Sequence, residues 1–507
     1  MSDSQRVAKN TIYMYIRMIL IMLVSIYTSR VVLEKLGVDD YGLYSAVASV
    51  IAMVNFLNQT LSTSTSRFLA YDIGKRDEEL LRNTFSTAFF SHLFLALLII
   101  VMMESVGLWY MTNKFVIPEG RESVVFIVYQ LSIVITALSV CIVPYKGLLV
   151  AYEDMSIYAY VGILEALLQL MVAYLLTVSP IDKLTSYACL LLTVQIFVAC
   201  VYVTICLKKY ACSKLKLYIS KTTFKKMLGF SGWTAIANLS NTLTDQGSIL
   251  LLNLFFSPAI IASKAISDQV SSAINIFINN FRAALNPSII KTIAANDFER
   301  GKRMTLMSTI VSFDMILILG LPFVFTIETV LALWLVEVPP LAVFFTRIAI
   351  ISQIIGSIST STYIAFVSSG KLTSNAICGI ITGFAFFVFL YLIFQMGGEA
   401  LWVQYLSLVF ALIWVLLLRP LFLNRDVNYT FKEVFKTYLE CFKVAILSVL
   451  FSFVLYVVLP HNIYGQILLF VGVAGICLII SYCLMDAYMK GIVKEMVFSK
   501  IKALLRR

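Results

Sequence analysis

Residues 258–290 read PAIIASKAISDQVSSAINIFINNFRAALNPSII, a stretch long enough to cross a bilayer as a helix and yet rich in polar side chains. An α-helix brings residues three or four positions apart onto one face. Six polar residues follow such spacings and form one continuous stripe: Lys264, Asp268, Ser271, Asn275, Arg282 and Asn286. Lipid does not accommodate such a stripe, so we expect it to face other helices or a water-filled cavity.

The composition of the 507-residue chain indicates that most of it lies in lipid. Hydrophobic residues make up 60% of the chain and charged residues only 13%, against about 25% charged residues in a soluble globular domain. A soluble domain with a single core is therefore excluded. The nine cysteines show no C-x-x-C spacing, and His92 and His461 stand alone, so we expect no metal site and no cofactor.

Many segments of the chain are candidates for membrane-spanning helices, each of which needs about 20 mostly apolar residues. The sequence predicts an all-α polytopic membrane protein with about fourteen such helices. Their expected ranges are 11–33, 41–69, 84–108, 123–146, 154–178, 183–207, 228–256, 258–290, 305–335, 340–368, 373–395, 400–423, 440–460 and 464–486. The spans at 41–69 and 258–290 are unusually polar for membrane helices.

The distribution of basic residues predicts the orientation of these helices. Most of the 39 lysines and arginines, with Lys146 and Arg419 among them, fall in loops that we assign to the cytoplasm. The opposite loops hold only Lys35, Lys114, Arg121 and Lys183. Both termini are thus expected in the cytoplasm, with the first helix retained and not cleaved as a signal peptide. The net charge of +11 is mainly this topology signal, so nucleic acid is not an expected partner, whereas anionic membrane lipid is.

A lysine-rich linker divides the chain into two halves. We expect an N-terminal lobe of six helices at 1–207, a basic cytoplasmic linker at 208–227 and a C-terminal lobe of six helices at 228–423. Two extra helices and a basic cytoplasmic tail follow at 424–507. A weak repeat displaced by about 220 residues, with Asn55 opposite Asn275, suggests that the lobes are related, as is typical of secondary transporters.

Six cationic side chains lie within the expected spans, where a lone charge costs roughly 2.5–3.5 kcal/mol on insertion scales. They are Arg17, Arg30, Arg67, Lys264, Arg282 and Arg347. Several interpretations stay open: Lys264 and Asp268 can neutralise each other, and the arginines can extend to the membrane surface, most readily Arg30 and Arg347. The third interpretation is a wet cavity that binds an anion, lined also by Asn55, Gln59, Asn241 and Asn275.

Acidic residues also lie within the spans. Glu165, Asp245, Asp268 and Asp314 can pair with an arginine, stay protonated, or bind a coupling ion such as H⁺ or Na⁺. Among these, Asp245, Asp268 and Glu165 are the candidates for ion coupling.

Residues 29–44, SRVVLEKLGVDDYGLY, resemble the junction of the first two helices in polysaccharide-biosynthesis exporters. These are the Wzx-like oligosaccharide (O-antigen) flippases of the multidrug/oligosaccharidyl-lipid/polysaccharide (MOP) superfamily. Asn10-Thr11 and the loop Gly74-Lys75-Arg76 fit the same pattern, although Arg30 stands a few residues earlier than in many members. The motif match covers about the first 80 residues.

The resemblance implies two six-helix lobes, two extra C-terminal helices and a cationic central cavity, for which Arg17, Arg67, Lys264 and Arg282 are the matching candidates. It also implies a flippase in the bacterial cytoplasmic (inner) membrane that moves an undecaprenyl-diphosphate-linked oligosaccharide to the outer leaflet by alternating access. Other polysaccharide-assembly proteins are possible partners. Two alternatives remain: a multidrug or cation exporter of the same superfamily, and a membrane-embedded polysaccharide polymerase or ligase, an enzyme.

Overall fold

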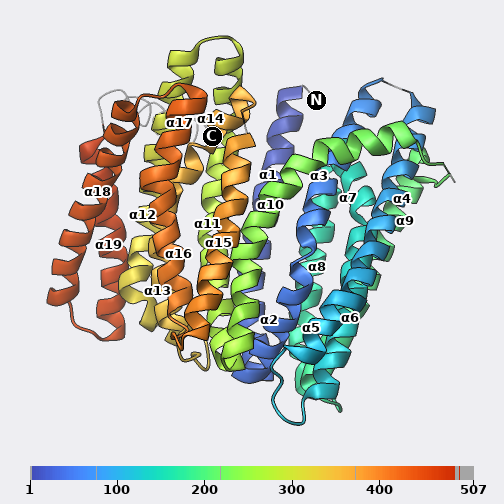
Figure 1. The fold of residues 1–507 in the computed structure, drawn as a ribbon, viewed down its shortest axis with the longest axis horizontal. Helices are drawn as coiled ribbons and strands as arrows, with labels where there is room; N and C mark the ends of the chain where they lie inside the picture. Colours follow the sequence, from blue (N-terminus) through green and yellow to red (C-terminus); the bar gives the residue numbers. More distant parts are fainter. Residues whose placement is uncertain (1–2, 76, 217, 372, 486–489, 491–507) are drawn as a thin grey trace, which may run out of the picture. The chain divides into compact units, whose positions relative to one another are not determined.

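The computed structural model describes residues 3–75, 77–216, 218–371, 373–485 and 490, and every regular element in these ranges is helical (Figure 1). Eleven of its helices, or runs of joined helices, are long and apolar enough to cross a membrane. The all-α prediction is confirmed, and the helix composition fits a polytopic membrane protein.

Three expected spans are absent from these eleven. The range 41–69 falls on α2 (Val38–Ala52) and α3 (Asn55–Lys75), and the ranges 228–256 and 258–290 fall on α10 (Lys221–Phe255) and α11 (Pro258–Ala294). α10 and α11 are long enough to span a bilayer but are too polar to qualify by composition. The count of about fourteen spanning helices stays a prediction. The three expected spans that do not qualify are the ones that carry the most polar residues.

The chain divides into two compact units, of which unit 1 comprises the described parts of residues 1–266, 334–342 and 375–403. In addition to α2, α3 and α10, unit 1 contains α1 (Asp3–Leu36), α4 (Glu78–Met102), α5 (Leu108–Asn113), α6 (Glu122–Cys141), α7 (Val143–Ala151), α8 (Met155–Leu175), α9 (Lys183–Lys209) and most of α15 (Thr373–Gln395). The short helical turns η1 (Met103–Gly107), η2 (Leu176–Val178) and η3 (Ala211–Ser213) join them.

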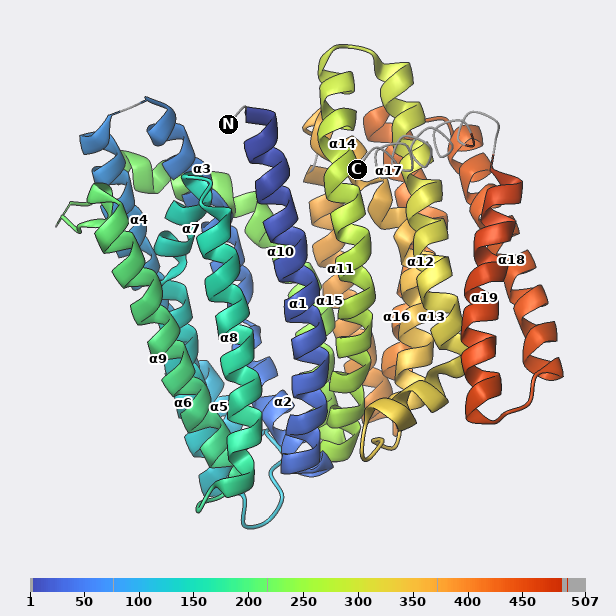
Figure 2. The ribbon, with the colours of Figure 1, turned by 180° about the vertical axis from the view of Figure 1, so that it is seen from behind.

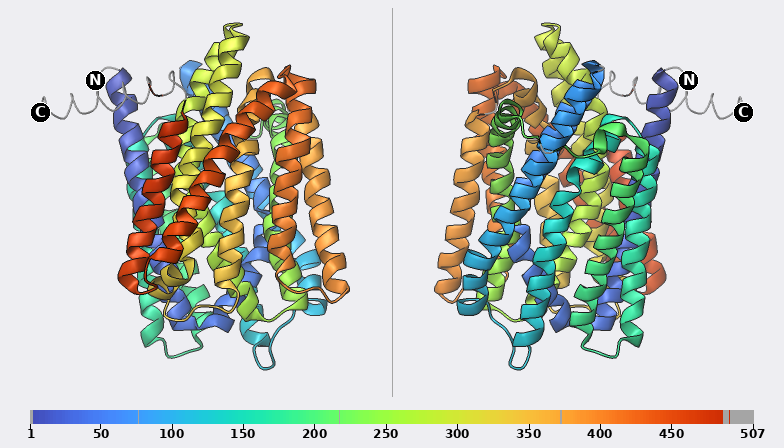
Figure 3. Two further views of the ribbon diagram at one scale, coloured as in Figure 1. Left: turned by 90° about the vertical axis from the view of Figure 1, so that its left-hand side faces the viewer. Right: turned by 90° about the vertical axis from the view of Figure 1, so that its right-hand side faces the viewer.

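Unit 2 comprises the described parts of residues 267–333, 343–374 and 404–507. It contains most of α11, α12 (Phe298–Trp334), α13 (Ala342–Ser361) and α16 (Trp402–Ile413), together with α14 (Tyr363–Ser369), η4 (Trp414–Leu418), α17 (Arg419–Val427), α18 (Phe431–Val458) and α19 (Ile463–Leu484). α18 and α19 lie side by side as an antiparallel pair where two extra helices were expected (Figure 3). The predicted lobe boundaries stay a prediction, and most of the basic tail lies outside the described residues.

The lysine-rich linker is fastened to α4. Its backbone accepts a hydrogen bond at the Lys214 carbonyl from Arg82 Nε (2.9 Å). Its amides at Lys216 and Ser220 donate to the hydroxyls of Ser86 and Thr87, both at 3.0 Å. Ser220 then caps α10, which begins at Lys221 inside the predicted linker. The segment is therefore an integral part of unit 1 and not a loose tether.

Two glycines in the motif at 29–44 have direct structural reasons. Gly37 separates α1 from α2 with a φ of 83°, in the left-handed region that favours glycine. Gly42 is buried against the start of α11, where an added Cβ would stand 2.0 Å from the Pro258 carbonyl oxygen. Only glycine allows the backbones of α2 and α11 to approach this closely.

Gly42→Ala should therefore destabilise the protein, by about 1–3 kcal/mol for an overpacked site. Gly74→Ala is the matched control, because Gly74 is an exposed helical glycine with open space around its Cα, where alanine favours the helix. Thermal unfolding of the purified chain in detergent measures both changes. Equal stability of the two variants would contradict the close approach of Gly42 to Pro258.

Arg121 joins two carboxylates near the first residues of α2, α6 and α9. Its guanidinium donates from Nη2 to Asp40 and from Nη1 to Asp182 Oδ2. Burial raises the pKa of Asp40, because desolvation outweighs the bond to Arg121. Burial acts in the same direction on Asp182, but the Thr185 amide and Arg121 stabilise its charged form and hold its pKa below the usual value.

These opposite shifts predict opposite pH behaviour. A lowered folded-state pKa gives stability that is present above the unfolded value, about 3.9 for aspartate, and lost as the pH falls through the folded value. Asp182→Asn, which keeps the cap on α9, should lower the free energy of unfolding at neutral pH by on the order of 1 kcal/mol. That deficit should shrink below about pH 4. Asp40→Asn should cost less at neutral pH or stabilise, because the folded protein disfavours the Asp40 charge. Thermal melts across pH test the pair, and a larger loss for Asp40→Asn would contradict this account.

Candidate functional site

Arg17 is held between α1 and α8, which pack along each other in unit 1 (Figure 2). Its guanidinium carbon lies 4.5 Å from the centre of the Tyr158 ring, a cation–π contact. The same group lies over Gly162, one turn further along α8, where an added Cβ would stand 2.5 Å from Arg17 Nε. The absent side chain at Gly162 thus provides the space that the guanidinium occupies.

Arg17 Nε is buried and donates no hydrogen bond to any described residue. A buried N–H without a partner carries a desolvation penalty, more for a charged group than for a neutral one. Buried polar atoms left in this way commonly bind water, an ion or a ligand. The Nε of Arg17 is therefore a donor available to an anionic or polar ligand.

A second cation, Lys146 on α7, belongs to the same cluster. Its Nζ lies 5.0 Å from the centre of the buried Tyr202 ring of α9, and both Arg17 and Glu165 are close enough to act on it electrostatically. Glu165 stands three residues after Gly162 on α8 and also acts on Tyr202. We call Arg17, Lys146, Glu165, Tyr158 and Tyr202 the Arg17 cluster. It contains two cations and one carboxylate, so its net charge is positive.

Lys146 was not predicted as a site residue, because its sequence context indicated a cytoplasmic loop. The structure places it inside a helix, partly buried, in a run that is apolar enough to span a membrane. Pro144 near the start of α7 was the available signal, since proline favours the first turn of a helix. Arg419 was also assigned to a loop. Its side chain is instead buried, with its guanidinium carbon 5.3 Å from the ring centres of Phe366 and Trp414.

Arg30, another predicted cation of unit 1, lies apart from this cluster. Arg30 is thirteen residues beyond Arg17 on α1, about 20 Å along the helix axis. It is partly buried and acts electrostatically on Tyr174, whose hydroxyl shares a 2.6 Å hydrogen bond with that of Tyr27. Arg67 lies on α3 with an exposed side chain.

Unit 2 has a polar group of its own between α11 and α13. Arg282 Nη2 donates to the Ser357 carbonyl (3.3 Å), while its Nε is buried and bonds to no described residue. Gln353 Nε2 donates to the Ser271 carbonyl (3.1 Å), which leaves Gln353 Oε1 and Ser271 Oγ buried without partners. The polar stripe predicted on 258–290 therefore has buried polar atoms without hydrogen-bond partners on the face toward α13.

The remaining predicted site residues are placed as follows. Lys264 is buried on α11, Asp268 and Asn275 are partly buried further along the same helix, and Asp245 is exposed on α10. Arg347 is partly buried and donates from Nε to the Val324 carbonyl of α12 (3.1 Å). The side chains of Asn55, Gln59 and Asn241 lie outside the described residues.

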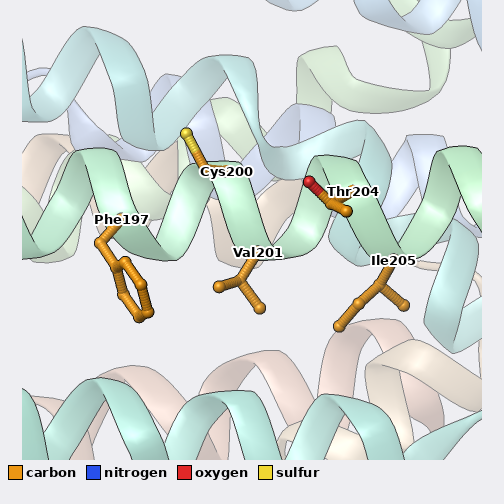
Figure 4. Close-up of a pocket in the computed structure, with 5 residues that line it drawn as sticks. All are labelled: Phe197, Cys200, Val201, Thr204 and Ile205. Atoms are coloured by element: carbon orange, nitrogen blue, oxygen red, sulfur yellow. The ribbon is translucent and has the colours of Figure 1, made fainter.

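An apolar hollow of about 250 Å³ lies on α9. It is lined by Phe197, Cys200, Val201, Thr204 and Ile205, of which Phe197, Val201 and Ile205 point to the same side of the helix (Figure 4). A shallow apolar hollow on a helix of this composition suits contact with lipid chains and lacks the polar groups of a specific site.

No protein-family model matches the sequence, and no curated protein matches it. The fold does match solved structures. The lipid II flippase MurJ, in an inward closed conformation, matches with a TM-score of 0.67 at 13% identity, over 94% of this chain and 99% of that chain. An inward-facing multidrug resistance transporter of the MATE family matches with a TM-score of 0.63 at 14% identity, over 80% of this chain and 96% of that one. This chain shares the fold of both proteins.

A third matching structure is described by reference to the polarity of its binding pocket. It is a MOP-superfamily transporter from Pyrococcus furiosus for which reverse polarity of the binding pocket suggests a different function. It matches with a TM-score of 0.57 at 14% identity, over 80% of this chain and 94% of that chain. At such identities the three matches establish the fold, and the charge of the site must be taken from this chain's own residues.

The placement of Arg17 makes a prediction for Gly162→Ala. The new methyl group should push the guanidinium off Tyr158, with little effect on stability because the end of an arginine side chain is flexible. Modification of Arg17 by phenylglyoxal, followed by mass spectrometry, should then rise several-fold. Gly475→Ala, at a helical glycine with open space around it, is the control and should change nothing. Equal Arg17 reactivity in wild type and Gly162→Ala would contradict the contact.

Proposed function

We propose that this protein is a flippase that moves an undecaprenyl-diphosphate-linked oligosaccharide from the inner to the outer leaflet of the bacterial cytoplasmic membrane. The proposed mechanism is alternating access, and the proposed process is surface polysaccharide biosynthesis. The observation that carries the proposal is the pair of cations, Arg17 and Lys146, in apolar helices, where Glu165 is the one carboxylate among the described residues that is seen to act on Lys146. An anionic ligand supplies the missing negative charge.

A diphosphate fits these residues chemically. The planar guanidinium of Arg17 presents N–H donors in the geometry that phosphate oxygens accept in a bidentate way, and its Nε is not bonded elsewhere. Lys146 adds a compact positive charge. The rings of Tyr158 and Tyr202 make cation–π contacts with Arg17 and Lys146. An apolar hollow such as that on α9 suits a polyprenyl chain.

The structural matches support a transporter over an enzyme, because the matched proteins are transporters and flippases. MurJ is named for a lipid-linked substrate, and its structure covers 94% of this chain, against 80% for the MATE transporter. The multidrug exporter is the second candidate on this fold. An excess of positive charge in the Arg17 cluster disfavours an organic cation as cargo, since like charges repel in a low dielectric.

Three further parts belong to the proposal. Both termini lie in the cytoplasm, H⁺ or Na⁺ coupling acts through Asp245, Asp268 or Glu165, and other polysaccharide-assembly proteins are partners. Arg282 in unit 2 has its own unbonded Nε and is a further candidate for binding an anionic group.

Binding of a diphosphate-linked polyprenyl oligosaccharide to the full chain in nanodiscs tests the proposal. Arg17→Ala should weaken binding roughly 10- to 100-fold, because a hydrogen bond to a charged group is worth about 1.5–3 kcal/mol. Lys146→Ala should weaken it less than Arg17→Ala, and Arg17→Lys should fall between wild type and Arg17→Ala because it keeps the charge but loses the fork.

Lys183→Ala is the matched control, since Lys183 is exposed at the start of α9 and should not affect binding. Wild-type affinity in folded Arg17→Ala and Lys146→Ala variants would contradict the proposed function. So would transport of an organic cation that is unaffected by both substitutions.

A further inference from the structure

Of the four acidic residues that the sequence places within the expected spans, Asp314 is the one that the proposed function leaves without a role. It lies near the middle of the 37-residue helix α12, with 3% of its surface exposed. Both carboxyl oxygens are buried, and no cation among the described residues pairs with them. Such an isolated carboxylate is strongly disfavoured in its charged form.

The surroundings of Asp314 come from α12, α18 and α19. Aromatic pairs hold these helices together: Phe323 lies 5.1 Å from Phe470, and Phe325 lies 5.9 Å from Tyr456, measured between ring centres. Helices α12, α18 and α19 all contribute to the hydrophobic core of unit 2. Asp314 is therefore enclosed within unit 2 by the C-terminal pair of helices.

Small polar residues line the faces of α18 and α19 that are buried in this core. On α19, Cys477 and Ser481 are one turn apart, and on α18 Ser448 and Ser452 are one turn apart; all four are buried. Ser481 lies beside the Asp314 carboxyl, and Cys477 lies close enough to it for an electrostatic effect. The hydroxyl of Ser452 is buried without a hydrogen-bond partner, and that of Ser448 lies beside the Cys477 thiol.

No basic side chain among the described residues acts on the carboxyl. The titratable groups near it are the thiols of Cys441 on α18 and Cys477 on α19, both affected by Asp314. Tyr438 stands three residues before Cys441, with its hydroxyl buried and unbonded. Arg347 on α13 is engaged with the carbonyl of Val324, ten residues or about 15 Å along α12 from Asp314.

We infer that Asp314 is a proton-binding site, at which a neutral carboxyl group is kept between α12 and the α18–α19 pair and can hydrogen-bond to Ser481. Serine hydroxyls and cysteine thiols can bond with a neutral acid but carry no charge to balance an ionised one. Loss of the proton places an unpaired negative charge inside the packed core, which weakens the packing of α18 and α19 on α12. The inference rests on unit 2 alone and does not depend on the substrate proposed above.

Infrared spectroscopy of the full chain in liposomes tests the site, since the C=O stretch of a protonated carboxylic acid is separate from the bands of a carboxylate. In sodium-free buffer at neutral pH, the wild-type spectrum should contain a protonated-acid band that Asp314→Asn removes. Glu328→Gln, at an exposed acid on the same helix, should keep the band. Raising the pH should reduce it as Asp314 ionises.

Ser481→Ala keeps Asp314 and provides a second measurement if Asp314→Asn does not fold. A hydroxyl that donates to a carboxylate favours the charged form, so its removal should shift loss of the band to higher pH by roughly half to one unit. The inference is overturned if the band is absent in wild type, if it persists in Asp314→Asn, or if Ser481→Ala leaves its titration unchanged. Loss of the band on adding sodium at constant pH would also overturn it, in favour of a sodium site.

Discussion

The contact of Arg17 with the face of Tyr158 and the bare backbone of Gly162 is the interaction on which the site in unit 1 depends. A guanidinium in an apolar helix needs either water or a partner. Here α8 provides an aromatic face and a space, but no acceptor for Nε. Burying the Arg17 guanidinium therefore costs desolvation free energy that no hydrogen bond at Nε offsets. This is the property expected of a site that binds an anionic ligand.

Two acids within apolar helices, Glu165 and Asp314, illustrate how the environment decides what a carboxyl group does. Glu165 lies within electrostatic reach of Lys146, so its charge is partly balanced, and it reduces the net charge of the Arg17 cluster. Asp314 has only hydroxyls and thiols near it. The first acid is suited to act as a counter-ion and the second as a carrier of a proton.

Much of the fold followed from the sequence, because the length and composition of a membrane helix are local properties. The all-helical class, the long polar helix at 258–290 and the two C-terminal helices were predicted in this way. Arg17 was also proposed as a site residue, from the cost of a charge within a span, and this role stays a prediction. The number of spanning helices was not settled, since α3, α10 and α11 are too polar to qualify by composition and α2 ends after 15 residues.

The partners of each charge could not be predicted, since they come from other helices. The sequence of α1 does not indicate that Arg17 will pack against Gly162 of α8. Lys146 was assigned to a loop because the preceding helix ends at Ile142 and only a short helix follows. Asp314 was recognised as an acid within a span, but three roles remained open. The choice among them needed the contacts of α18 and α19, more than 110 residues away in sequence.

The most direct test of the central claim is translocation by the purified full chain in proteoliposomes. The labelled probe is a polyprenyl-diphosphate-linked oligosaccharide, and the measurement is its appearance in the opposite leaflet, compared with a polyprenyl-linked oligosaccharide that lacks the diphosphate. The account predicts translocation of the diphosphate lipid alone and its loss in Arg17→Ala. Equal translocation of both lipids, or transport of an organic cation with no movement of either lipid, would contradict it.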